Sequence, residues 1–251
     1  MLGLEVALLS EQGGRTYNED ACGHWHSDSQ LCCVLADGAG GHGGGHIASR
    51  VVVESLLNGF AAQPSHDGSS LERLVRGANR AVRNARVPDS ERAEMYSTAV
   101  SLVIDFVHHQ AHWAHAGDSR LYWFRHGRIV ERTHDHSLVQ ALVDAGMLQP
   151  EQMRSHPKRS ELRSALGTDD HELEVSASGA PRALQPGDVF LLCTDGVWEH
   201  LDDSVLEATL QQSPTPHAWL AALEDQVTEA VRDKRSHDNF TALAVWTRLA
   251  P

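Results

Sequence analysis

Four aspartates stand at the borders of short apolar runs that are typical of buried strands. They are Asp37 after LCCVLA, Asp118 after HWAHAG, Asp195 after VFLLCT and Asp238 before NFTALAV. Glu19 and Asp20 add a further acidic point ahead of the first of these runs. A single acid at a strand end is most often a solvated turn residue. Carboxylates gathered from several strand ends, however, repel one another and have to be neutralised.

Divalent metal ions are the neutralising groups that these residue types favour. Few Lys or Arg residues accompany the acids, and the sequence contains no CxxC and no HExxH motif. Oxygen ligands without sulfur and with little imidazole indicate a hard cation, Mg²⁺ or Mn²⁺, in preference to Zn²⁺. The carboxylates are more numerous than the ligands that one such ion needs. Two ions that share a bridging aspartate would use them, and such a pair can activate a water for in-line attack on phosphorus.

A glycine-rich turn follows the first of these aspartates. In the stretch LCCVLADGAGGHGGGHIAS, glycine occupies positions 38, 40, 41, 43, 44 and 45. Backbone without side chains can adopt positive φ and approach an ion or a phosphate closely. By itself the turn is equally well explained as an ordinary connection between a strand and a helix. The recurrence of acids at strand ends favours a metal-binding loop over a loop that cradles phosphate with its amides.

A β-rich framework with helices in blocks has to position these acids. Alternation and β-forming residues predict strands over residues 4–8, 31–36, 98–107, 111–116, 121–124, 129–132, 188–194 and 239–249. Helical spacing predicts helices that begin near residues 47, 69, 137, 202 and 216. Ser69 and Glu72 have capping-box spacing, and Leu138, Ala141 and Leu142 are expected to face inward. Short turns between consecutive strands indicate antiparallel pairing, so we expect an α+β fold of paired sheets covered by helices.

The composition excludes several classes of protein. The formal net charge of −13 argues against a nucleic-acid or anionic-membrane binder. No apolar run is long enough to span a membrane, and the N-terminal residues lack a basic region, so a cytoplasmic location is expected. The four cysteines are expected to be reduced and buried. Without a repeat or a low-complexity linker, residues 1–251 are expected to form a single domain.

Five motifs in order resemble the PPM (protein phosphatase 2C-like) metal-dependent serine/threonine phosphatases, and the compact bacterial branch most. They are RTYNED, LADGAGGHGGGHIAS, GDSRLY, LLCTDGVWEHL and HDNFTALAV. The resemblance extends from Glu5 to Thr247. It implies a four-layer αββα sandwich, in which two antiparallel sheets are flanked by helices.

The resemblance also implies a role for each residue of the core metal site. Asp37 matches the aspartate that bridges two metal ions, and Gly38 matches the glycine whose carbonyl binds the second ion. Asp195 and Asp238 match the other ligands of the first ion.

Further roles follow from the same resemblance. Glu19 and Asp20 match the acidic pair that serves the second ion, partly through water. Asp118 matches a ligand of a third, weaker ion in bacterial members, which Asp195 also touches. Arg15 matches the arginine that grips the substrate phosphate. His42, just past the glycine turn, is either a surface histidine or a general acid, since an acidic site raises the pKa of a histidine.

Two other segments bear on the resemblance. Residues 144–167 correspond to a mobile flap beside the active site, in which Lys158, Arg159 and Arg163 either contact a phosphoprotein or are ordinary solvated charges. The family's usual Met-Gly-Thr-Thr-like run reads Met95-Tyr96-Ser97-Thr98 here, so that Tyr96 replaces a glycine.

The sequence thus predicts a phosphatase of phosphoserine and phosphothreonine in proteins, which uses a water or hydroxide between two Mn²⁺ or Mg²⁺ ions and reverses a serine/threonine kinase. A monomer is expected. One alternative is a catalytically weak module of the same fold that senses phosphoproteins. Another is a phosphatase of small molecules or of anti-sigma-factor antagonists.

Overall fold

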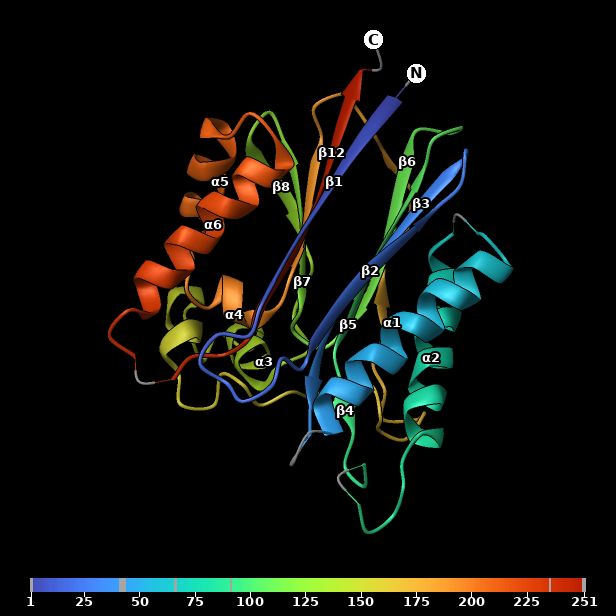
Figure 1. Cartoon of the computed structure of the whole chain (residues 1–251), viewed down its shortest axis with the longest axis vertical. Coiled ribbons are helices and arrows are strands. Elements are labelled where there is room, and N and C mark those ends of the chain that lie inside the picture. Colours follow the sequence, from blue (N-terminus) through green and yellow to red (C-terminus); the bar gives the residue numbers. More distant parts are fainter. Residues whose placement is uncertain (1, 41–43, 66, 91, 235, 250–251) are drawn as a thin grey trace.

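The computed structural model describes residues 2–40, 44–65, 67–90, 92–234 and 236–249, and it forms a sandwich of two antiparallel sheets (Figure 1). One sheet has five strands in the order β1-β12-β11-β7-β8, and the other follows the order β10-β6-β5-β3-β2, with β4 beside β3 and β9 beside β6. Helices cover the outer face of each sheet. The predicted αββα architecture is therefore confirmed.

The five-stranded sheet combines strands from both ends of the chain. Its strands are β1 (Leu2–Glu11), β12 (Phe240–Leu249), β11 (Val189–Cys193), β7 (Arg120–Arg125) and β8 (Arg128–Arg132). The second sheet is built from β2 (Asp20–His26), β3 (Gln30–Ala39), β4 (Tyr96–Ser97), β5 (Ala99–Asp105), β6 (Gln110–Ala116), β9 (Ser176–Ala177) and β10 (Arg182–Ala183). The predicted strands recur here, but β3 continues through Asp37 and Gly38 instead of ending before them.

The helices form two outer layers. The second sheet is covered by α1 (Gly44–Ala62) and α2 (Gly68–Asn84). The remaining helices are α3 (Leu138–Asp144), the 3₁₀ helix η2 (Pro150–Ser155), α4 (Asp195–Trp198), α5 (Asp203–Gln212) and α6 (Pro216–Val231). Of these, α4, α5 and α6 cover the five-stranded sheet, as Figure 1 shows. No helix in the described ranges is both long enough and apolar enough to cross a membrane.

Three apolar cores hold these four layers together. The first lies between α1, α2 and the second sheet, and includes Phe60 and Val75. The second lies between the five-stranded sheet and α5 and α6, where the Trp219 ring meets the Phe124 ring edge-on at 5.4 Å. The third fills the space between the two sheets, around Leu35 and Phe190. All four cysteines are free thiols, as expected, and Cys32, Cys33 and Cys193 are buried, whereas Cys22 at the sheet edge is only half-buried. Burial raises the pKa of the three buried thiols.

Two local predictions are wrong. The second helix is capped by Asp67 and not by Ser69, because the Asp67 carboxylate accepts from the Ser70 amide at 2.8 Å and from both neighbouring serine hydroxyls. The Ser65 hydroxyl also donates to Asp67, and a carboxylate with these four donors is the stronger cap. In α3 the buried residues are Val139 and Gln140, whereas the three residues predicted to face inward are only half-buried. Two helical turns are too short to define a period reliably.

The connection after β6 determines where the acids lie. β5 pairs with β6 and β7 pairs with β8, but β6 and β7 belong to different sheets, so the four consecutive strands do not form one meander. Residues 117–119 carry the chain from one sheet to the other. Gly117 has a φ of +101°, a conformation in which a Cβ would collide with Thr98. This crossover brings Asp118 between the two sheets.

Candidate active site

The predicted acids converge at one end of both sheets. Asp20 opens β2 and lies directly opposite Asp37 near the end of β3. Asp195 follows the last residue of β11 by two positions and begins α4, while Asp238 precedes β12 by two positions. Antiparallel pairing of β11 with β12 and of β2 with β3 places all of these strand ends together.

A cavity of about 350 Å³ opens at this end. The predicted site residues that line it are Arg15, Glu19, Asp37, Gly38, Asp118, Asp195 and Asp238. Asp20 lies behind the lining, where its carboxylate accepts from the Thr194 hydroxyl at 3.0 Å. His42 falls outside the described residues. The structure therefore brings together the aspartates that were noticed at strand ends, and with them Arg15 and Gly38, which only the family resemblance had suggested.

Burial, together with repulsion between neighbouring carboxylates, raises the pKa values of the acids in the cavity. Burial, and then the neighbouring aspartates, raise the pKa of Asp37 and of Asp195 well above the ordinary value. Burial raises the pKa of Asp20 and of Asp118 to about 7, and it also raises the pKa of Glu19. With a pKa of about 7, Asp20 and Asp118 are partly protonated near neutral pH when no cation is bound. A cation that binds among them would replace those protons.

The chemistry of the donors fits divalent cations. The donors are all oxygens, and the Asp195 Oδ1 atom is buried without a hydrogen-bond partner. A Cβ at Gly38 would overlap the carbonyl oxygens of Gly45 and Glu19, so only glycine allows these three backbone segments to meet. Within the described ranges, no three His, Cys, Asp or Glu side chains form a group that could hold an ion as they stand. One of these carboxylates already has a cationic partner: the Arg15 guanidinium forms an ion pair with Asp238, with 2.6 Å between Nη2 and Oδ2.

Buried hydroxyls fix the backbone of Asp37. The Thr98 Oγ1 atom accepts from the Asp37 amide at 2.9 Å, and the Thr98 amide donates to the Asp37 carbonyl at 2.8 Å. The Ser97 hydroxyl donates to the same carbonyl at 2.9 Å. Thr98 Oγ1 also lies 2.7 Å from Ser119 Oγ, next to Asp118. These hydroxyls therefore link two of the acidic loops, a role that sequence reasoning missed.

Asn239 was also missed, and it fixes the segment that carries Glu19. Its Oδ1 accepts from the Glu19 amide at 2.9 Å, while its Nδ2 donates to the carbonyls of Gln12 and Tyr17 at 2.6 and 2.9 Å. One amide side chain therefore holds both sides of the turn on which Arg15 lies. Its position directly after Asp238 was the available clue, because a polar residue before a buried strand needs partners.

A buried ion pair stands behind Asp118. Arg120 makes two hydrogen bonds with Asp135, at 2.9 and 2.7 Å, and both side chains are almost fully buried. The Arg120 guanidinium lies 3.6 Å above the ring of Trp198, whose indole nitrogen donates to the Asp118 carbonyl at 2.9 Å. Burial and then Asp135 raise the pKa of Asp118, whereas Arg120 lowers it. The pair thus holds the Asp118 backbone through Trp198.

The segment predicted as a flap does lie beside the cavity. Ser160, Leu162 and Ala165 contribute to the cavity lining. Ser97 and Leu166 form an isolated β-bridge, which anchors the end of this segment next to β4. Arg159 donates to Glu199 at 2.9 Å, just beyond α4.

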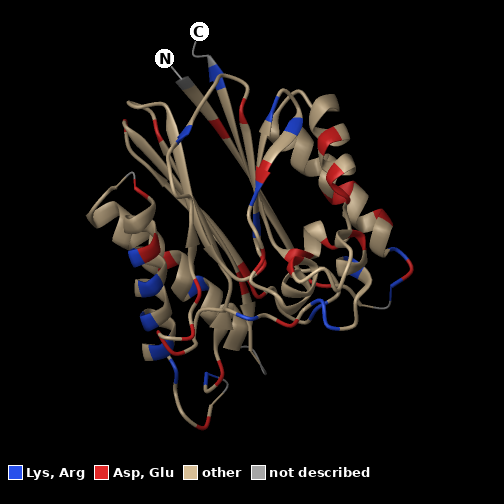
Figure 2. Cartoon of the chain, turned by 180° about the vertical axis from the view of Figure 1, so that it is seen from behind, with Lys and Arg blue, Asp and Glu red and all other residues tan. Residues whose placement is uncertain are grey.

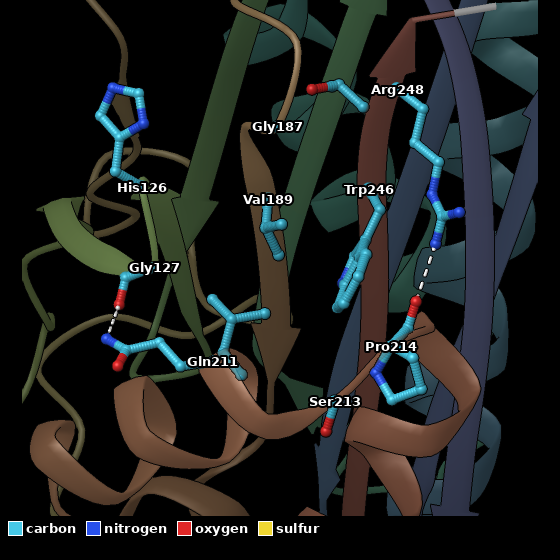
Figure 3. Close-up of a pocket in the computed structure, with 11 residues that line it drawn as sticks. His126, Gly127, Gly187, Val189, Gln211, Ser213, Pro214, Trp246 and Arg248 are labelled. Carbon is cyan, nitrogen blue, oxygen red and sulfur yellow. Dashed lines mark hydrogen bonds between the residues drawn. The ribbon is translucent and has the colours of Figure 1, made fainter. Parts of the chain in front are cut away.

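A larger groove of about 470 Å³ lies elsewhere on the five-stranded sheet (Figure 3). It is formed by His126 after β7, Val189 at the start of β11, and Trp246 and Arg248 near the end of β12. The acids occupy the opposite ends of β11 and β12. The groove is therefore separate from the acidic cavity, and no carboxylate is part of its lining.

The fold and the site together define an αββα sandwich with an acidic, oxygen-lined cavity where the two sheets end. A sequence model of the protein phosphatase 2C family matches residues 10–234, and the chain belongs to this family.

Curated relatives are similar over almost the whole chain. PstP, a serine/threonine protein phosphatase of Mycobacterium tuberculosis, is 35% identical over 247 residues, which are 94% of this chain and 46% of PstP. The chain thus spans about half the length of this relative. The protein phosphatase PhpP of Streptococcus pneumoniae is 31% identical over 248 residues, which are 96% of this chain and 97% of PhpP.

Solved structures share the fold. The M. tuberculosis phosphatase PstP/Ppp superimposes with a TM-score of 0.83 at 30% identity, with coverage of 98% of this chain and 99% of that one. The PstP catalytic domain in complex with two manganese ions gives a TM-score of 0.82 at 28% identity, with coverage of 99% and 100%.

Proposed function

We propose that this protein is a metal-dependent phosphatase of phosphoserine and phosphothreonine in proteins. The observation that carries the proposal is the cavity that Asp37, Asp118 and Asp195 line together, where Asp118 is buried, the other two are half-buried, and the pKa of each is raised. Burial and repulsion between the carboxylates both disfavour their charged forms, and a bound cation would stabilise these forms. Family membership and the two manganese ions in the related PstP structure support the same activity.

Two ions, Mn²⁺ or Mg²⁺, are proposed for the core site. Asp37 would bridge them, the Gly38 carbonyl would bind the second, and Asp195 and Asp238 would complete the first. Bound there, the ions would supply Lewis-acid activation of a water and neutralise charge on the phosphate.

The remaining residues around the core are assigned as follows. Glu19 and Asp20 would serve the second ion, partly through water. Asp118, which lines the cavity with Asp195, is the proposed ligand of a third ion.

Arg15 is the proposed phosphate-binding residue. Its side chain is 54% exposed, lines the cavity, and already reaches the carboxylate of Asp238. When cations occupy the carboxylates, the guanidinium is released to pair with the phosphate oxygens, which it can grip in a bidentate manner. His42 remains the proposed general acid for the leaving oxygen.

The biological setting is proposed from the same activity. A protein phosphatase acts on phosphorylated proteins, and we expect a serine/threonine kinase to supply them. A cytoplasmic, monomeric enzyme that binds neither nucleic acid nor membrane is the expected form.

Turnover with added metal tests the proposal. Purified protein with Mn²⁺ or Mg²⁺ should release phosphate from p-nitrophenyl phosphate and from a phosphothreonine peptide, and chelation with EDTA should stop it. Asp37→Asn should be inert under the same conditions. Wild-type protein that is as inert as Asp37→Asn with either metal would overturn the proposal. Tight phosphopeptide binding without phosphate release would instead support the sensing module.

A further inference from the structure

The exposed side of α2 carries a row of arginines. Arg73, Arg76, Arg80 and Arg83 follow one another at intervals of three, four and three residues. At about 100° per residue these side chains fall within roughly 80° of arc on the helix. They lie away from the face that buries Val75, and in Figure 2 the blue segments follow the outer side of this helix. We call these four residues the arginine row.

The two outer layers of the sandwich differ in charge. The helices α5 and α6 contain no Lys or Arg and five acidic residues, namely Asp203, Glu207, Glu224, Asp225 and Glu229. The helix α2 has four arginines and one acid, Glu72. The protein as a whole carries a formal charge of −13. A basic helix face on such an acidic protein attracts acidic partners to one side only.

Carboxylates of the chain itself already bind this row. Glu72 pairs with Arg76 at 2.8 Å, Asp169 pairs with Arg83 at 2.5 Å, and Asp170 lies 3.8 Å from both Arg80 and Arg83. Among the described residues, the hydrogen bonds of the Arg73 guanidinium go only to the hydroxyls of Ser69 and Ser70. The arginine row therefore has four guanidinium groups, whereas the three carboxylates of Glu72, Asp169 and Asp170 reach it.

The arginine row leads to the rim of the acidic cavity. Arg86, one turn beyond Arg83, lies 4.8 Å from the centre of the Tyr96 ring. Tyr96 in β4 pairs with Ala39 of β3, and Ala39 lines the cavity. A hollow of about 480 Å³ between Arg80, Arg83, Arg86 and Asp170 lies along this path.

We infer that the arginine row and the Arg86–Tyr96 pair form a docking surface for an acidic segment of the phosphoprotein substrate. The inference rests on the proposed phosphatase activity. The helix is about 25 Å long, from 17 residues at 1.5 Å each. An extended segment of about ten residues would span it. Acidic side chains on that segment would pair with the exposed guanidinium groups while the phosphate occupies the cavity.

Two peptides that differ only in charge test the inference. Both carry one phosphothreonine with about ten flanking residues on each side, rich in glutamate in one peptide and in glutamine in the other. Because exposed ion pairs are individually weak, three or four of them together should raise kcat/KM for the acidic peptide about tenfold at low salt. The preference should decline at about 0.5 M NaCl.

A matched pair of triple variants locates the effect. The variant R73Q/R80Q/R83Q should lose the preference for the acidic peptide. R128Q/R232Q/R248Q removes three exposed arginines from the opposite side of the sandwich with the same change in net charge, and it should keep the preference. Turnover of p-nitrophenyl phosphate should be equal in all three proteins, because this substrate is too small to reach α2.

Binding separates failure of this inference from failure of the phosphatase proposal. A fluorescent, non-phosphorylated acidic peptide should bind wild type and the second triple variant, but not R73Q/R80Q/R83Q, whether or not the protein hydrolyses anything. Equal turnover of both peptides by the wild type, or equal loss in both triple variants, would overturn the docking surface. Tighter binding of a DNA oligonucleotide of equal charge through the same arginines would overturn the assignment to an acidic polypeptide.

Discussion

Replacing Thr98 with valine removes one hydroxyl and leaves the shape of the side chain almost unchanged. That hydroxyl accepts from the Asp37 amide at 2.9 Å and lies 2.7 Å from Ser119 Oγ, and both Thr98 and Ser119 are buried. Valine leaves these two polar groups without a partner. A buried unsatisfied group costs about 1–3 kcal/mol, so we expect Thr98→Val to lower the free energy of unfolding by about 2–4 kcal/mol.

Thr98→Ser is the matched control. Serine keeps the hydroxyl and removes only the methyl group that packs against Gly117. The loss of one buried methyl should cost about 1 kcal/mol. Urea unfolding in EDTA measures both variants without a contribution from bound metal. A smaller loss for valine than for serine would show that packing, and not the hydroxyl, determines the stability here, and the proposed link between the two acidic loops would be wrong.

Metal affinity gives a second readout of the same substitution. If Thr98 positions the backbone of Asp37, Thr98→Val should raise the Mn²⁺ concentration needed for half-maximal turnover by about tenfold, and Thr98→Ser should change it little. A merely structural role would lower stability and leave this concentration unchanged.

Three further predictions follow from the geometry. Burial raises the pKa of Asp118 from 3.8 to about 7. The protonated Asp118 carboxyl therefore contributes fully to the stability of the fold below about pH 4, and this contribution is lost as the pH rises through 7. In EDTA, the free energy of unfolding of Asp118→Asn should depend less on pH between 5 and 8 than that of the wild type. Arg120→Met leaves a buried carboxylate unpaired and should cost about 3–5 kcal/mol in urea unfolding, whereas Arg128→Met, whose side chain is 70% exposed, should cost less than about 1 kcal/mol. Gly38→Ala should reduce Mn²⁺-dependent turnover about a hundredfold. The control is Gly146→Ala, because a Cβ at Gly146, where φ is +70°, would meet no atom within 4 Å. This control should lose about 1 kcal/mol of stability and keep its turnover.

The clustering of the aspartates could be predicted because each of them lies at the end of a buried strand. Once Asp37, Asp195 and Asp238 are placed beside buried strands, antiparallel pairing brings them to one end of the sandwich. Alternation also identified most strands, since each is long or strongly apolar. The shortest ones, such as β10 with two residues, leave no pattern that could be read from the sequence. The seven-residue strand β2 was also missed, because its polar and histidine-containing sequence DACGHWH shows no clear apolar alternation.

Other features could not be predicted because they depend on contacts between distant segments. Thr98 is 61 positions from Asp37, and Asn239 is 220 positions from Glu19. The exchange of the chain between sheets after β6 depends on a single glycine with positive φ, Gly117. Consecutive strands with short turns usually pair, so the pattern alone indicated a meander.

The chemistry of these missed residues explains why they suit an acidic cavity. Carboxylates that must accept cations cannot also be neutralised by permanent ion pairs, yet their loops have to be held against mutual repulsion. Thr98, Asn239 and Trp198 do this with neutral groups that bond the backbone of acidic loops. The carboxylate oxygens of these loops therefore remain available to cations. The exposed Arg15 neutralises Asp238 from the cavity side, where an entering cation can replace it.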